Sequence, residues 1–420
     1  MRPALLSSRR SLHFWPRVSV MNTKVLPVDI THFRFQAQPD DEFGVQNAKP
    51  VITKETDQTA ILEAVRELKA GQAVGIPTET VYGLAANALQ EDAVAKIFAA
   101  KNRPADNPLI VHVSSLDMLK TFMPDNTIPP VYLPIIKKLW PGPLTIILPS
   151  SPMIPSTVTC SQPTVAVRFP SHPVARALID ACGFPLAAPS ANSSGKPSPT
   201  LASHVFHDLQ GKIPLILDGG PCDVGVESTV LDALRTPPAI LRPGGITYES
   251  LLSLPHMNKL QVYRKHFVDE ALEQAPTTPG MKYRHYSPDA KVVLFEHSDK
   301  VSETTVHEVF ETKWKSELAG FQKAGVTVRK VGVLQTTPEG EACHWEQVQS
   351  KDGVEYIEIQ MGRRGHPEEV ARGMFKGLRE LDSRGVDLIF VQGIPELHEG
   401  MAVMNRLRKA ASKIIDLGEL

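Results

Sequence analysis

The sequence has few cysteines, no long apolar run and no excess of charge of one sign, and each lack excludes a class of protein. Four cysteines are scattered over 420 residues without a CxxC pair, so neither a zinc site nor a disulfide framework is indicated, and a reducing compartment is expected. No apolar stretch approaches the roughly 18 residues of a membrane span, so no membrane contact is expected. The formal net charge of -1 argues against a general nucleic-acid coat but is compatible with a local cationic patch.

The N-terminus is basic and rich in serine, with no acid before Asp29. Mitochondrial transit peptides have this composition because they are positively charged, amphipathic and poor in acids. A basic tail without a targeting role is the alternative, and Met21 offers a second start for a shorter form. We therefore expect a cytoplasmic protein, and also a mitochondrial form if the extension is a transit peptide.

The length exceeds that of a typical single domain, so two domains are expected. The stretch EQAPTTPGMKYRHYSPD (273–289) combines proline and glycine with polar residues, which predicts an interdomain linker. It would separate a larger domain at 51–272, which follows an N-terminal extension at 1–50, from a smaller domain at 290–420.

Helical spacing of apolar residues appears in two segments of the larger domain. TAILEAVRELKAG predicts a helix with Ile61, Leu62, Val65 and Leu68 on one face. EDAVAKIFAAK predicts a second helix that ends before a proline. In the smaller domain, helices are expected at 302–323, 367–383 and 398–414.

Short apolar runs alternate with these helices. Those that predict strands are QAVGIPT, PLIVHV, LTIIL, TVAVRF, PLAAPS, PLILD and STVLD in the larger domain, and KVVLFEH, TVRKVGVLQT and GVDLIFVQG in the smaller one. Strands alternating with helices indicate the α/β class: a twisted open sheet, followed by a smaller doubly wound unit. That unit contains neither GxGxxG nor a P-loop, so no nucleotide site of its own is indicated.

Short polar motifs occur between residues 76 and 245. In chain order they are IPTETVYGLAA (76–86), KNRPADNPLIVHV (101–113), WPGPLTIIL (140–148), VAVRFP (165–170), APSANSSGKPSPT (188–200), LDGG (217–220), GVESTVLD (225–232) and LRPGG (241–245). Small hydroxyl residues, glycine and proline dominate them. This composition suits a pocket for phosphate and carboxylate groups, because hydroxyls and backbone N–H groups donate hydrogen bonds while cations supply charge.

Four cations stand out in these motifs. Lys101 and Arg103 follow a predicted helix, where they could merely complement its dipole. Arg168 and Arg242 each end an apolar strand, and no acid lies near them in sequence to pair with a buried guanidinium. We interpret all four as ligands for phosphate and carboxylate groups, with arginine offering a fork of donors and lysine a point charge.

Other motif residues have two interpretations. The loop at 188–200 follows an apolar strand directly, as ligand loops of α/β sheets do, but a Ser/Pro surface loop has the same composition. Thr78, Glu79 and Thr80 could cap the next segment instead of binding a ligand. His112 lies within a predicted strand, where a buried core histidine is the more common outcome.

Taken together, these motifs resemble the YrdC-type threonylcarbamoyl-adenylate synthases in their longer two-domain form. The resemblance covers residues 55–250, continues through PGMKYRHYSP (279–288) and reaches MAVMNRLRKAA (401–411). It implies an L-threonylcarbamoyladenylate synthase, a nucleotidyltransferase that makes threonylcarbamoyl-AMP and pyrophosphate from L-threonine, bicarbonate and ATP. The product would serve N6-threonylcarbamoyladenosine modification of tRNA through the tRNA threonylcarbamoyl transferase complex, and direct contact with tRNA is compatible with this role.

The resemblance also implies which residues bind the substrates. The threonine side would consist of Thr80, His112, Arg168, Ala188 and Ser228. The ATP side would consist of Arg103, Asn107, Thr164, Ser190, Ser198, Arg242 and the linker residue Tyr283. Lys101 and Arg103 would be the catalytic cations. No covalent nucleophile and no proton transfer by His112 are expected, because the carbamate of threonine would itself attack phosphorus.

Magnesium is the expected cofactor, bound mainly through the ATP phosphates. Asp218, Asp223 and Glu227 could touch the ion, but Mg²⁺ on a nucleotide takes most of its ligands from phosphate and water. No dedicated protein metal site is therefore expected.

Two other functions are compatible with parts of the sequence. A YrdC-like module could bind tRNA or double-stranded RNA without synthase activity, although overall neutrality and the carboxylate-binding character of Arg168 disfavour it. The carbamoyl transferases of hydrogenase maturation also contain a YrdC-like unit, but that resemblance should bring CxxC zinc elements and an acylphosphatase segment, and neither is present.

Overall fold

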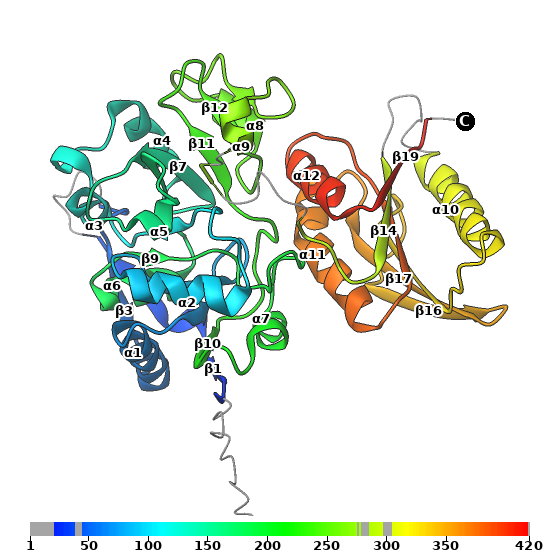
Figure 1. Cartoon of the computed structure of the whole chain (residues 1–420), viewed down its shortest axis with the longest axis horizontal. Coiled ribbons are helices and arrows are strands. Elements are labelled where there is room, and N and C mark those ends of the chain that lie inside the picture. The colour runs from blue at the N-terminus through cyan, green and yellow to red at the C-terminus, as the bar shows by residue number, and fades with distance from the viewer. Residues whose placement is uncertain (1–20, 38–43, 275–276, 279–284, 297–304, 419–420) are drawn as a thin grey trace, which may run out of the picture.

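The computed structural model describes residues 21–37, 44–274, 277–278, 285–296 and 305–418, which form two α/β domains (Figure 1). The larger domain is built on an eleven-stranded sheet and the smaller one on a six-stranded sheet. The fold class and the two-domain organisation expected from the sequence are thereby confirmed. Within the described residues, none of the helices has the length and apolar character needed to cross a bilayer.

The larger sheet is mixed and begins and ends with short edge strands. Across the sheet the order is β1 (Lys24–Pro27), β10 (Leu215–Asp218), β4 (Val74–Ile76), β5 (Gly83–Asn87), β9 (Leu186–Ala187), β6 (Ile110–His112), β8 (Thr164–Arg168), β7 (Leu144–Pro149), β11 (Thr229–Asp232), β12 (Ala239–Arg242) and β13 (Gln261–Val262). Strands β6 and β8 run parallel, and β9 runs antiparallel to both of its neighbours. The apolar runs expected to be strands of the larger domain all lie in this sheet, and β1, β5 and β13 are further strands that the sequence did not indicate.

Helices cover both faces of this sheet. They are α1 (Glu55–Lys69), α2 (Glu91–Lys101), α3 (Leu116–Thr121), α4 (Leu133–Leu139), α5 (Ser156–Thr159), α6 (Pro173–Cys182), α7 (Ala202–Leu209), α8 (Tyr248–Leu252) and α9 (Glu270–Gln274), with short 3-10 turns at Ile30–His32, Pro124–Asn126 and Pro130–Tyr132. Helices α1 and α6 pack over one face, and α2 packs over the other, because side chains of a strand such as β5 alternate between the two cores.

One residue of the predicted apolar face of α1 is not buried. Ile61, Val65 and Leu68 are buried against the sheet, but Leu62 is 57% exposed. Consecutive residues of an α-helix are rotated by about 100°, so the neighbour of Ile61 turns toward solvent. Apolar character alone was therefore a poor guide to the buried face.

The larger domain begins before residue 51. Strand β1 pairs in parallel with β10, and β2 (Phe33–Gln36) forms an antiparallel hairpin with β3 (Lys49–Ile52). The segment KVLP is only four residues long and ends in proline, which is why its apolar pattern did not indicate a strand. Much of the expected extension at 1–50 is thus part of the domain, while residues 1–20, which carry most of the transit-peptide pattern, lie outside the described residues.

The smaller sheet has the order β16 (Glu346–Lys351), β17 (Val354–Arg363), β15 (Lys330–Thr337), β18 (Leu388–Gln392), β14 (Lys291–Glu296) and β19 (Lys413–Asp416). All neighbouring pairs are parallel except β16 with β17. Helix α10 (Val306–Lys323) packs on one face, and α11 (Pro367–Ser383) and α12 (Gly400–Ala410) pack on the other (Figure 1). This is a doubly wound arrangement, as expected.

Three strands of the smaller sheet, β16, β17 and β19, were not predicted, and in β17 the sequence VEYIEIQMGR interleaves charged and apolar residues. Strand β16 is exposed along most of its length, so its sequence EQVQSK carries no apolar run. Strand β19 occupies part of the segment 398–414 that was predicted to be helical, and α12 ends at Ala410 because the chain then turns to pair with β14.

Helices α11 and α12 face the larger domain (Figure 1). One close approach is at Gly225, where an added Cβ would collide with the Arg372 Cα and lie 2.5 Å from the Ala371 carbonyl oxygen of α11. Only glycine permits this contact, and its φ of 80° is a conformation that side chains disfavour. The GVES motif therefore serves as a packing surface for the smaller domain as well as part of the polar motif series.

Candidate active site

Six of the eight polar motifs contribute residues to one pocket of the larger domain, and the motifs at 140–148 and 217–220 do not line it. Strands β6, β8 and β12 run in one direction and place His112, Arg168 and Arg242 at their carboxyl ends, and the segment after the oppositely directed β4 supplies Thr78 and Thr80. The predicted site residues that line the pocket are Thr80, Arg103, His112, Arg168, Ala188, Ser190, Ser228 and Arg242. The structure thus brings together three arginines from segments more than 60 residues apart in the chain.

Arg168 has an acidic partner that sequence inspection missed. Its Nη2 lies 2.7 Å from Glu79 Oε1, and both side chains are buried. Its Nη1 donates a hydrogen bond to the Thr80 hydroxyl at 2.8 Å. The pair is 89 residues apart in sequence, which is why no acid was apparent beside the strand. The Arg168 guanidinium holds the pKa of Glu79 below its usual range although burial opposes this.

Arg103 and Arg242 are held by backbone carbonyl groups. Arg103 donates from Nε to Asn107 O at 3.0 Å and from Nη2 to Pro108 O at 2.9 Å. Arg242 donates from Nη2 to Ser228 O at 2.8 Å. Burial lowers the pKa of Arg103 to about 10, so the guanidinium remains charged near neutral pH. Two rigid cations with fixed orientations suit the recognition of phosphate oxygens.

Lys101 lies beneath the 188–200 loop and is absent from the residues that line the pocket. Its ammonium group donates to the carbonyl oxygens of Ser190 and Asn192, the latter at 2.5 Å. Burial lowers its pKa well below the ordinary value, with the nearby Arg103 as the second cause. The structure therefore supports a role in holding Ser190 in place, and the direct phosphate contact stays a prediction.

Three of the remaining predicted ligands, Asn107, Ser198 and Thr164, do not line the pocket. Asn107 supplies a carbonyl to Arg103, and Ser198 donates to Glu227 Oε1 at 2.5 Å. Thr164 opens β8, at the opposite end of the strand from Arg168. Tyr283 lies outside the described residues.

Two linker residues that the sequence did not single out line the pocket, His285 and Tyr286. Both follow Tyr283 in the quoted PGMKYRHYSP motif, which was the available signal. Burial lowers the pKa of His285 to about 3 and raises that of Tyr286 to about 12. The Tyr286 ring also packs against Phe375 of α11, with ring centroids 5.2 Å apart. The linker thus connects the pocket with the smaller domain.

The smaller domain contacts the pocket through Glu227. Arg406 of α12 is fully buried and its Nε lies 3.0 Å from Glu227 Oε2, while Ser198 bonds to the other carboxylate oxygen. Although burial alone would raise it, the pKa of Glu227 falls to about 2 because of Arg406 and then Arg242. Glu227 is therefore an ionised carboxylate fixed from both domains, whereas the sequence suggested it only as a possible contact of a magnesium ion.

A second arginine of the smaller domain fixes the 188–200 loop. Arg379 of α11 donates from Nε to the Pro197 carbonyl at 3.0 Å and forms an ion pair with Asp208 at 2.8 Å. The Ser287 backbone N–H also donates to Gly195 O at 2.8 Å. The loop that carries Ser190 and Ser198 is therefore held by the linker and by α11.

His112 is expected to stay neutral across the physiological range. It is buried, and burial together with Arg168 lowers its pKa to about 3 from an ordinary value of 6.5. Because its folded-state pKa is depressed, its contribution to stability is fully present above pH 6.5 and declines as the pH falls toward 3. We expect NMR of imidazole-labelled protein to show no His112 titration between about pH 5 and 8. The same signal should titrate normally in denaturant, and a midpoint in that window for the folded protein would contradict the assignment.

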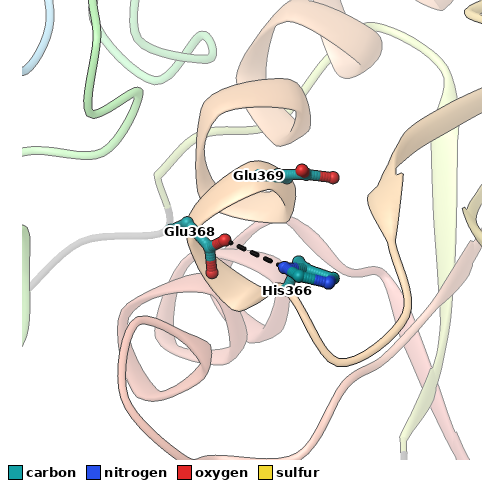
Figure 2. A group of neighbouring side chains, drawn as sticks. All are labelled: His366, Glu368 and Glu369. Carbon is teal, nitrogen blue, oxygen red and sulfur yellow. Dashed lines mark hydrogen bonds and ion pairs between the residues drawn. The ribbon is translucent and has the colours of Figure 1, made fainter.

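The described residues contain one cluster with metal-ligand geometry, His366, Glu368 and Glu369 at the start of α11 (Figure 2). It lies in the smaller domain and is mostly exposed, and Glu369 is already bound by Arg363. Around the pocket of the larger domain the lining is cationic, and its acid, Glu227, is paired on both oxygens. This donor set fits a Mg²⁺ ion that arrives on the phosphates of a nucleotide, rather than one held by carboxylates.

Comparisons with known proteins agree with this site and fold. A family model of the Sua5, YciO and YrdC group, described as Telomere recombination, matches residues 66–244. A second model, described as the C-terminal domain of threonylcarbamoyl-AMP synthase, matches residues 246–412. The chain is thus a YrdC-type α/β protein with an added C-terminal unit.

The relatives specify the family further. The threonylcarbamoyl-AMP synthase of Schizosaccharomyces pombe is 45% identical, with 94% of this chain and 99% of the relative covered. That of Pyrococcus abyssi is 43% identical, with 86% and 96% covered. The crystal structure of P. abyssi Sua5 complexed with L-threonine matches with a TM-score of 0.74 and 38% identity, over 94% and 99% of the two chains. The chain belongs to the two-domain, Sua5-type threonylcarbamoyl-AMP synthase family, as the resemblance of its motifs indicated.

Proposed function

We propose that this protein is a nucleotidyltransferase that converts L-threonine, bicarbonate and ATP into L-threonylcarbamoyl-AMP and pyrophosphate. The observation that carries the proposal is the convergence of Arg103, Arg168 and Arg242 on one buried pocket. A reaction that joins a carboxylate-bearing amino acid to a triphosphate requires fixed positive charge for both, and a shared pocket supplies it. The family to which the chain belongs supports the same activity.

The threonine side would be formed by Thr80, His112, Arg168, Ala188 and Ser228. Arg168 would bind the amino-acid carboxylate, and the neutral imidazole of His112 would accept or donate a hydrogen bond without adding charge. Ala188 is nearly buried and apolar, so it would contact the threonine methyl group.

The ATP side would be formed by Arg103, Asn107, Thr164, Ser190, Ser198 and Arg242, with Tyr283 as a further ligand. In the reaction, a carbamate oxygen of N-carboxy-threonine attacks the α-phosphorus, a new P–O bond forms, and the bond to the β-phosphate oxygen breaks as pyrophosphate leaves. Arg103 and Arg242 would offset the charge that develops, while Lys101 would hold the Ser190 loop. Catalysis then depends on positioning and electrostatics.

Mg²⁺ would neutralise phosphate charge when it is bound with ATP. The chain's own contribution would be to present hydroxyl groups of Ser190 and Ser198 and the guanidinium groups to the phosphates. No carboxylate of the protein is proposed as its ligand.

Substrate entry requires a movement near the linker. The pocket has a volume of about 40 Å³, whereas pockets for ligands of drug size are about 300 Å³ or larger. Tyr286 and His285 line this pocket, so displacement of these linker side chains is the movement that would admit ATP.

The activity is tested by incubating the full chain with ATP, bicarbonate and single amino acids and measuring pyrophosphate release. We expect release to require bicarbonate and to favour L-threonine over L-serine by about tenfold or more, because a pocket distinguishes one methyl group by that amount. Equal release with all amino acids, or release independent of bicarbonate, would contradict the proposal. A gel shift with tRNA but no turnover would support the RNA-binding alternative instead.

Partners and location extend the proposal. The unstable mixed anhydride would pass to the tRNA threonylcarbamoyl transferase complex, and any direct contact with tRNA is part of this proposal. We propose a cytoplasmic location. A form that carries the N-terminal segment before Met21 would be directed to mitochondria.

A further inference from the structure

The loop at 188–200, called here the serine loop, is held through its backbone carbonyl groups by two buried cations. Lys101 of the larger domain donates to two of these carbonyl oxygens, and Arg379 of the smaller domain donates to that of Pro197. Both cations are buried, and neither lines the catalytic pocket. A carbonyl oxygen bound to a buried cation is neutralised, so it repels a nearby phosphate less. The smaller domain thus acts on a loop of the nucleotide side.

The Arg379 guanidinium fixes the serine loop at two points. Its Nε and Nη2 donate to Pro197 O at 3.0 and 2.5 Å. Its Nη1 and Nη2 also donate to Asp208 of α7, at 3.2 and 2.8 Å, and Asp208 Oδ2 accepts a hydrogen bond from the Ser193 backbone N–H at 2.9 Å. Although burial would raise it, the pKa of Asp208 is lowered by Arg379, so the pair is ionised.

Asn192 connects these two points with the catalytic pocket. Its side chain is fully buried, and its Nδ2 donates to the carbonyl oxygens of Ser193 and Lys196 at 2.9 and 3.0 Å. Its Oδ1 accepts a hydrogen bond from the Ser190 hydroxyl at 2.5 Å, and Ser190 lines the pocket. A continuous series of hydrogen bonds therefore leads from Arg379 to a hydroxyl group in the pocket.

Two other contacts of α11 with the larger domain are more exposed. Arg372, about two turns earlier on the helix, donates from Nε to Asp223 O at 2.8 Å and is exposed. Lys196 pairs with Asp382 at 3.2 Å, and both side chains are partly exposed. Such contacts typically contribute little, and neither fixes a carbonyl group of the serine loop. Of the three contacts, the one made by Arg379 restrains the loop backbone.

We propose that Arg379 is a positioning residue for ATP, which sets the orientation of the Ser190 hydroxyl through Asp208 and Asn192. The inference rests on the proposed function, because it takes the serine loop to be part of the nucleotide side. Arg168, which would bind the carboxylate of threonine, is held by groups outside the loop. Arg379 therefore affects the binding of ATP more than that of threonine.

The test measures dissociation constants by calorimetry with the full chain, using α,β-methylene ATP and L-threonine as separate ligands. Arg379→Met should weaken binding of the ATP analogue about fivefold, the value of about one hydrogen bond, and leave the Kd for threonine nearly unchanged. Arg372→Met, on the same helix, is the matched control and should change neither constant. An unchanged Kd for the analogue, or an equal loss for both ligands, would overturn the proposal. Because no turnover is required, failure of the proposed function would appear separately, as absence of pyrophosphate release by the wild type.

A double-mutant cycle with Ser190→Ala tests the series of hydrogen bonds. In the Ser190→Ala background, Arg379→Met should weaken binding of the analogue by less than about twofold, because the group through which it acts is already absent. Arg379→Lys keeps a charge beside Asp208 and so preserves the fold if Arg379→Met does not. It lacks the fork of donors, so it should produce a smaller but measurable loss of affinity. Wild-type affinity in Arg379→Lys, or the same loss from Arg379→Met in both backgrounds, would overturn the proposal.

Discussion

Replacement of Arg103 by methionine is expected to reduce threonine- and bicarbonate-dependent pyrophosphate release by about a thousandfold or more. The guanidinium is buried at the pocket, its Nε and Nη2 are fixed by the carbonyl groups of Asn107 and Pro108, and its Nη1 has no partner among the described residues. A donor that is already oriented stabilises developing phosphate charge without reorganisation, and the loss of one such donor costs about 10²–10³ in rate. Arg103 would offer more than one contact, so the expected loss lies above that range.

The matched control for Arg103→Met is Arg176→Met. Arg176 is also a buried arginine of the larger domain, but its guanidinium lies over the Phe35 ring, 3.7 Å from the centroid, and does not line the pocket. This substitution should lower stability with little change in kcat. Arg103→Lys should restore part of the activity lost in Arg103→Met, because charge returns without the fork of donors. Full turnover in Arg103→Met would remove the assignment of the nucleotide side.

The part of the site that could be predicted consists of residues that lie at the ends of strands. Arg168 and Arg242 end apolar strands, and His112 ends another, so their meeting at one edge could be expected once the α/β class was recognised. The pairing of residues that lie far apart in the sequence could not be predicted. Glu79 reaches Arg168 over a separation of 89 residues, and no local pattern in either segment indicates the other.

The contribution of the smaller domain was the least predictable part. Its helices were recognised from their spacing, yet nothing in MAVMNRLRKAA distinguishes Arg406, which is fully buried, from Arg408, whose side chain is 42% exposed. The difference depends on how α12 is rotated against the larger domain. Helical periodicity fixes which residues share a face, but it does not fix which partner that face meets.

Arg406 is therefore the position at which we expect the largest effect outside the pocket itself. Arg406→Met leaves the Glu227 carboxylate buried without its main partner, and removing one member of a buried ion pair typically costs about 3–5 kcal/mol. The loss should appear as a lower free energy of unfolding. Because Glu227 also orients Ser198, we expect the KM for ATP to rise about tenfold or more, with a smaller change in the KM for threonine.

The matched control is Arg408→Met, two residues along the same helix. Arg408 pairs with Glu296 and Glu396 of its own domain and is partly exposed, so its loss should cost about 1 kcal/mol or less and leave both KM values unchanged. Arg406→Lys should recover part of the stability, because an ammonium group can still neutralise Glu227. A merely structural Arg406 would lower stability and leave the two KM values in their original ratio. A selective rise in the KM for ATP would instead show that the smaller domain completes the nucleotide site, because the one carboxylate held by Arg406 also receives the hydrogen bond from Ser198.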